Sequence, residues 1–183
     1  MKRNLTWLAL VALMLVGTLA WADEYADTVS VFKKAGESAL YFDKSYGYAV
    51  FPTIGKGGLG IGAAHGSGRV YAKGKYVGDT SMTQVSFGLQ AGGQAYSQIV
   101  FFEDKRSFDE FTSGNFEFGA GVSAVAITAG ASASAGSTGP SAGASGGKND
   151  ATTRGTYRKG MAVFTVAKGG LMYEASIAGQ KFS

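Results

Sequence analysis

Apolar and polar positions change from a helical period to a strand period partway along the chain. Tyr25, Val29 and Phe32 recur three or four residues apart, which is the spacing of one face of an α-helix. Gly36 interrupts this face, and a second apolar group follows it. The pattern therefore predicts two short amphipathic helices within residues 23–46.

From Gly47 onward, apolar residues alternate with small or polar ones, as is typical of β-strands. We expect Pro52 to end the first short strand. Glycine-containing triplets at 66–68 and 73–75 then predict turns between two or three further strands. Residues 83–103 predict either one long bent strand or two strands.

Three glycines interrupt this last strand pattern. Glycine inside a strand costs stability and usually marks a bulge, a bend or a close approach of two backbones. We therefore expect Gly88, Gly92 and Gly93 to let a buried sheet bend sharply and accept close packing.

Glutamines accompany these glycines. We expect Gln90 and Gln94 to make hydrogen bonds in the interior or at an edge of the sheet, because an unpaired buried amide costs about 1–3 kcal/mol. For Gln94 and Gln98, a polar face that contacts water is the alternative interpretation.

After residue 103 the pattern predicts one inserted helix. Asp104 can cap it, Gly114 can end it, and Phe108 and Phe111 fall three positions apart on one face. The chain is therefore expected to leave the sheet briefly and return to it.

Strand-like alternation resumes at residues 116–126 and ends in a segment of low complexity. Residues 130–150 contain no large side chain, so we expect a flexible Gly/Ala/Ser loop. The final apolar segment predicts a hairpin around residues 167–170. Residues 23–183 are thus expected to form a single α+β domain. In it, N-terminal amphipathic helices precede a largely antiparallel, glycine-rich, bent β-sheet or partial barrel with one inserted short helix.

Residues 1–22 resemble a secretory signal peptide. Lys2 and Arg3 precede an apolar run over residues 5–20, and the following Ala-Trp-Ala suits signal peptidase. Without the two cations, 17 − 2 = 15 basic residues face 13 acidic ones. This small excess does not favour a nucleic-acid partner. We expect a periplasmic or secreted protein.

The residues offer little for catalysis. The chain contains no cysteine, which excludes disulfides, thiol chemistry and lipoprotein acylation. Residues 58–63 match a dinucleotide-binding pattern, but a predicted turn follows where that site needs a helix. His65 is the single histidine, and the carboxylates next to the inserted helix are typical of a solvated surface. We therefore expect no enzymatic activity, no cofactor and no metal site.

Four segments together resemble the SYLF-domain family. They are GYAVFPTIGKGGLGIGAAHGSGRVY, SFGLQAGGQAYSQIVFF, FEFGAGVSAVAITAG and KGGLMYEASIAGQKF. The family includes bacterial exported proteins and eukaryotic regulators of actin patches and phosphoinositide membranes. The resemblance implies a lipid-binding domain, with an N-terminal amphipathic helix and basic residues at the membrane. An actin role is not expected for an exported protein.

On this resemblance, the lipid-binding residues expected here are Phe32, Lys33, Lys34, Lys44 and Lys56. The expected function is peripheral, reversible binding to anionic phospholipid. Two alternatives stay open from the sequence. One is a structural or stress-related envelope protein with a protein or cell-wall partner, and the other is a small outer-membrane β-barrel.

Overall fold

The computed structural model describes residues 24–119, 124–127, 157–168 and 179–183. A helix over residues 24–34 and helix α2 (Gly36–Lys44) come first, as predicted. A long hairpin and a short helix follow, formed by β1 (Gly47–Ala72), β2 (Lys75–Phe102) and α3 (Lys105–Phe111). The remaining strands are β3 (Phe116–Glu117), β4 (Val125–Ile127), β5 (Met161–Lys168) and β6 (Gln180–Phe182).

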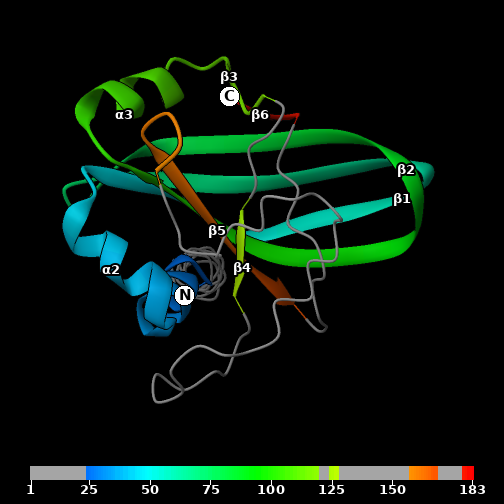
Figure 1. Ribbon diagram of the computed structural model, residues 1–183, viewed down its shortest axis with the longest axis horizontal. Coiled ribbons are helices and arrows are strands. Elements are labelled where there is room, and N and C mark those ends of the chain that lie inside the picture. Colours follow the sequence, from blue (N-terminus) through cyan, green and yellow to red (C-terminus); the bar gives the residue numbers. More distant parts are fainter. Residues whose placement is uncertain (1–23, 120–123, 128–156, 169–178) are drawn as a thin grey trace, which may run out of the picture.

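The hairpin formed by β1 and β2 folds back on itself. The strands pair antiparallel from Gly47↔Phe102 to Ala72↔Lys75, yet the start of β1 lies against its own end. The Lys73 N–H donates to the Tyr46 carbonyl at 3.0 Å, and the rings of Tyr48 and Tyr71 stack with centroids 5.0 Å apart. Figure 1 shows both strands turning back at one end of the molecule. The bent sheet expected from the sequence is confirmed.

The bend coincides with a break in strand register. Leu59 pairs with Ala91 and Ile61 with Phe87, so two steps along β1 (61 − 59 = 2) span four along β2 (91 − 87 = 4). Extra residues on one strand of a pair increase its local twist and bend. Gly88 lies within this longer stretch of β2 and Gly92 one residue beyond it.

The turn predicted at residues 66–68 is wrong, because β1 continues through it. A Cβ atom on Gly66 would lie 2.7 Å from Ile54 Cγ1, and one on Gly68 would lie 2.5 Å from the Phe51 ring. These glycines therefore allow the two halves of β1 to pack closely, instead of reversing the chain. The turn at 73–75 is confirmed, with Lys73 and Gly74 at positive φ.

Pro52 also fails to end its strand. It lies in the register shift between Phe51 and Ile54, where a residue without an N–H removes no bond from the ladder. The Ser97 hydroxyl donates to the Pro52 carbonyl at 2.7 Å, which ties this bulge to β2.

The centre of the sheet is buried on both faces, which explains the unbroken apolar run that ends β2. Ile99 and Phe101 pack with Phe32 and Phe164 under the N-terminal helices. On the opposite face, Val100 and Phe102 belong to a second cluster that includes Phe108, Phe111 and Phe182. Each helix is therefore held to the sheet by large apolar side chains.

The inserted helix α3 is confirmed with its cap. The Asp104 carboxylate accepts from the Ser107 N–H at 2.8 Å, while the Asp104 N–H donates to the Ser107 hydroxyl at 3.3 Å. This capping box starts the helix, and Phe108 and Phe111 then reach the core as predicted.

The described C-terminal strands both pair with β2, while the hairpin predicted around residues 167–170 stays a prediction. β5 and β6 each pair antiparallel with β2, and β6 also pairs with β3. β5 ends at Lys168, at the expected turn, but residues 169–178 lie outside the described residues. Of the strand predicted over residues 116–126, the structure assigns β3 and β4 as strands among the described residues. The loop predicted at 130–150 lies outside the described residues as well.

Candidate functional site

The five residues expected to contact lipid come from three elements. Lys33 and Lys34 are exposed on helix 24–34, and Lys44 is exposed at the end of α2. Lys56 is half-buried in β1, where it pairs with Gln94 toward the bend. Figure 1 places α2 at the opposite end of the molecule from that bend. The structure thus groups the helical lysines and separates Lys56 from them.

Phe32 is fully buried and holds its helix on the sheet. Its ring lies in the cluster of Val50, Phe101 and Phe164, and its carbonyl accepts from the Ser38 hydroxyl at 2.6 Å. Contact between this ring and a lipid would therefore require the helix to leave the sheet. The lipid role expected of Phe32 stays a prediction that this packed arrangement does not support.

Aromatic side chains support the helical cations. The Lys33 amine lies 5.3 Å from the centre of the Phe42 ring, and that ring contacts Phe101 edge-on at 4.9 Å. Cation–π contacts of this kind are worth about 0.5–1 kcal/mol at exposed sites. The Lys33 ammonium group is therefore held near the Phe42 ring at the surface.

A second cation joins helix 24–34 to the hairpin turn. The Arg69 guanidinium lies 4.2 Å from the Tyr25 ring centre and 3.7 Å from the Asp79 carboxylate. Burial raises the pKa of the Tyr25 phenol, an effect that the Arg69 charge partly opposes. The phenol therefore stays neutral over the physiological pH range. Arg69 contacts both elements and so connects the helix to the hairpin.

The two N-terminal helices combine exposed apolar groups with charges of both signs. Val31 and Leu40 are 41 % and 59 % exposed, beside the three lysines. The same helices also carry four carboxylates, Glu24, Asp27, Glu37 and Asp43. Attraction to an anionic surface must therefore depend on the local grouping of the lysines, since the net charge of the helices does not favour it.

The interior of the bent sheet contains a polar layer. Gln98 and Gln180 are fully buried and exchange two amide hydrogen bonds, at 3.0 and 3.1 Å. The Gln180 amide also faces the oxygens of Gln84 at 3.2 Å and Tyr96 at 3.3 Å. Gln98 thus makes hydrogen bonds in the interior. Gln94, in contrast, is exposed, and the side chain of Gln90 lies outside the described residues.

This layer carries no charge at neutral pH. Burial raises the pKa of Tyr96 to about 12, and the hydrogen bond from Gln180 lowers it only in part. Amides do not titrate in this range. The layer therefore stabilises the attachment of β6 to β2, and its chemistry does not resemble an acid–base site.

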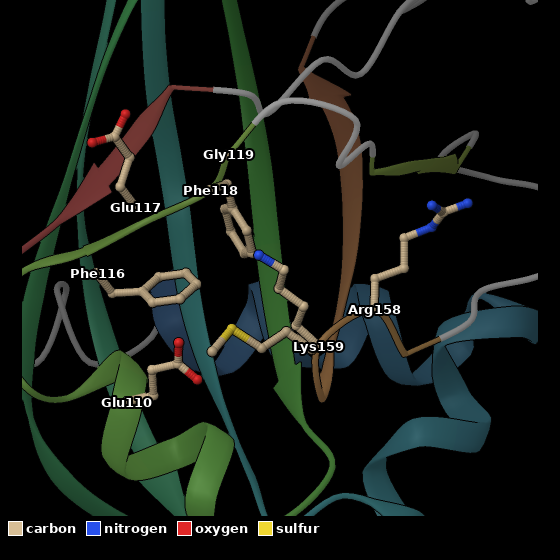
Figure 2. A pocket seen from close by; sticks show the side chains of 8 residues that line it. Glu110, Phe116, Glu117, Phe118, Gly119, Arg158 and Lys159 are labelled. Atoms are coloured by element: carbon tan, nitrogen blue, oxygen red, sulfur yellow. The ribbon is translucent and has the colours of Figure 1, made fainter.

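An open hollow lies between α3, β3 and the turn before β5 (Figure 2). Glu110 and Glu117 line it together with Arg158 and Lys159, and Phe118 forms part of its wall. The Lys159 side chain points into the hollow, whereas the Arg158 side chain extends away from Phe118 (Figure 2). Because this open surface carries charges of both signs, it favours neither anionic nor cationic ligands.

The described part of the chain contains neither a metal-ligand cluster nor a helix that could span a membrane. No three histidine, aspartate or glutamate side chains there are grouped as metal ligands would be. No helix there is long and apolar enough to cross a bilayer.

The sequence analysis missed an apolar surface at the bend, where Leu59 and Ile61 are 82 % and 60 % exposed. A signal for it was present. Small residues occupy every second position of β1 from residue 58 to 68, which is the pattern of one closely packed face. The positions between them, including Leu59 and Ile61, must then face outward.

Comparison with known proteins identifies two similarities. Residues 83–183 match the family Ysc84, described as Las17-binding protein actin regulator. The chain is also 33 % identical over 161 residues to Beta cell expansion factor A of Aeromonas veronii. That alignment covers 86 % of the chain and 53 % of the relative, so the chain spans about half of the length of this protein.

Proposed function

The chain belongs to the Ysc84 family of SYLF-type domains, and on that premise we propose that it is an exported, non-enzymatic protein that binds anionic membrane surfaces. Binding is peripheral and reversible. The lysines of the N-terminal helices contact phospholipid headgroups, and exposed apolar side chains between them contact the interface.

The observation that carries this proposal is the outward face of the two helices. Lys33, Lys34 and Lys44 are exposed beside Val31 and Leu40, while the opposite helix face is fixed to the sheet through Phe32. A basic residue close to an anionic leaflet contributes about 1 kcal/mol. Three such contacts, partly opposed by nearby carboxylates, give weak binding that salt reverses.

Vesicle flotation of charge variants tests this proposal. Lys33→Gln/Lys34→Gln/Lys44→Gln in the full chain should float with phosphatidylglycerol vesicles at least tenfold less well than the unsubstituted protein. The matched control, Lys75→Gln/Lys105→Gln/Lys181→Gln, removes the same charge from exposed positions on other elements. Every variant keeps the apolar segment at residues 5–20, so this segment cannot cause a difference between them.

Equal flotation of both triple variants would contradict a role for the helical lysines. Equal melting temperatures would show that neither variant lost binding through unfolding. An envelope protein with a protein or cell-wall partner is the alternative that the first result would favour.

A further inference from the structure

We infer that the bend of the folded hairpin is a second lipid-contact site, which inserts apolar side chains into the membrane interface. This inference rests on the proposed function and adds to it the place at which the protein enters the bilayer. The bend surface is defined here as Leu59, Ile61, Ala63 and Val85.

These four residues lie on one outward face of the sheet. In β1, Leu59, Ile61 and Ala63 are exposed, whereas Gly62 and Ala64 between and after them are buried. Ala63 pairs with Val85, which is 53 % exposed. Ile61 and Val85 are therefore diagonal neighbours across the strand pair, close enough to form one surface.

The apolar surface ends at polar residues on the side toward the hairpin turn. The next outward pair along the hairpin is His65 with Thr83, whose side chains lie 3.3 Å apart. On the other side of the bend, the next pair on this face is Gly57 with Gly93, both exposed, while Lys56 and Gln94 pair at the alternate positions between the two faces. A short apolar tip that ends at polar residues on one side and at glycines on the other fits a membrane interface better than a deep membrane crossing.

Charge distinguishes the bend from the other exposed apolar positions. No Asp or Glu occurs in residues 44–78 or 80–102, so no carboxylate of the hairpin lies near the bend. By contrast, Leu40 shares its helix with Glu37 and Asp43, and Val77 lies two residues from Asp79. The bend is therefore the apolar surface of the hairpin best suited to anionic lipid.

The backbone holds these apolar side chains in place. Gly58 has a φ of +152°, and a Cβ atom there would lie 2.7 Å from the Gly62 Cα. Only glycine fits such a position without moving the chain. The bend therefore presents Leu59 and Ile61 already arranged, which lowers the entropy that must be lost on insertion.

The absence of cysteine from the sequence permits a test that reports position by position in the full chain. Leu59→Cys and Ile61→Cys each introduce a unique thiol, which we would label with the environment-sensitive fluorophore NBD. With phosphatidylglycerol vesicles, both labels should brighten, shift to the blue and be quenched by brominated lipid. Val77→Cys, at a similarly exposed position (54 %) near the hairpin turn, is the control and should change little.

A fourth label separates this inference from the proposed function. If the protein floats and Leu40→Cys responds while the two bend labels do not, the bend inference is overturned and the helical site stands. If the bend labels are already blue-shifted without vesicles, another segment of the protein covers this surface, which also overturns the inference. If the protein does not float at all, the proposed function fails, and the bend inference fails with it.

Loss of affinity supplies an independent readout. Leu59→Ser/Ile61→Ser should weaken vesicle binding about tenfold or more, because two exposed apolar side chains no longer leave water on binding. Tyr76→Ser/Val77→Ser, at two exposed apolar positions near the hairpin turn (both 54 %), is the matched control and should bind within about threefold of the parent. Equal loss in both double variants would overturn the specific role of the bend.

Discussion

Individual glycines in β1 act mainly through close packing. Gly68 provides the space in which the Phe51 ring lies, and Gly66 does the same for Ile54. Gly78, in contrast, has no atom within 4 Å of the position its Cβ would occupy. The glycine content predicted a bend correctly, but composition alone could not distinguish a glycine that permits close approach from one that forms a turn.

Gly68→Ala should therefore destabilise the protein by about 1–3 kcal/mol, because the added methyl group overlaps the buried Phe51 ring. Gly78→Ala is the control and should be neutral or slightly stabilising. Urea denaturation of both variants measures the difference. An unchanged midpoint for Gly68→Ala would contradict the close packing of the two halves of β1.

The buried glutamine pair makes a second residue-scale prediction. Gln98→Leu leaves the Gln180 amide without its reciprocal partner and should cost about 1–3 kcal/mol of unfolding free energy. Gln98→Leu/Gln180→Leu should recover part of this loss, since both partners of the pair are then apolar. Gln94→Leu, at an exposed position of the same strand, should be near neutral. A denaturant series in which Gln94→Leu and Gln98→Leu are equally stable would refute the pairing.

Tyr96 gives the polar layer a dependence on alkaline pH. Its pKa is raised from 10.0 to about 12, so the phenol ionises first in the unfolded chain. The stability due to this group is complete below pH 10 and is lost as the pH rises toward 12. Two pH units correspond to about 3 kcal/mol. Tyr96→Phe should make stability fall less steeply between pH 10 and 12, and an identical slope would contradict the burial of the phenol.

Among the elements, those with strong local signals were predicted best. The helices over 24–34 and 36–44 and the capped helix α3 were predicted, because helical period and capping are local properties. β1 and β2 were divided too finely, because Gly66, Gly68 and Pro52 look like strand breakers unless their cross-sheet neighbours are known. Pairing of β6 with β2 joins residues about a hundred positions apart, which no local pattern reveals.

The turn before β5 offers a prediction at this scale. Arg158 and Met161 exchange backbone hydrogen bonds across Lys159 and Gly160, which have φ values of 54° and 80°. Such turns favour Asn or Gly at the first central position. Lys159→Asn should therefore stabilise the protein by about 0.5 kcal/mol, measured by thermal denaturation. Lower stability would contradict a preference for Asn at this position of the turn.

The candidate site was predicted only in part, and the reason is again spatial. Sequence alone could identify lysines on amphipathic helices, but it assigned the buried Phe32 to the lipid-facing set, because hydrophobic period does not say which apolar face meets the sheet. The exposed bend was missed although small residues at every second position over residues 58–68 signalled an outward face between them. Its residues are adjacent to the glycine pattern that the sequence analysis took for turns.

For the molecule as a whole, two surfaces at opposite ends of the bent sheet are proposed to contact the membrane. The helical surface supplies lysines, and the bend surface supplies exposed apolar side chains with no nearby carboxylate of the hairpin. Electrostatic attraction then governs approach, whereas apolar insertion governs how long the protein stays. Flotation should accordingly show both a dependence on lipid charge and a residual fraction that salt does not remove.

The most direct test of this account is flotation of the full chain with phosphatidylglycerol and phosphatidylcholine vesicles, each at about 20 mM and 500 mM salt, where screening lengths differ several-fold. The account predicts strong flotation with the anionic vesicles at low salt, a marked decrease at high salt, and little flotation with the neutral vesicles. Equal flotation with both lipids at both salt concentrations, or none with either, would contradict binding to anionic membrane surfaces.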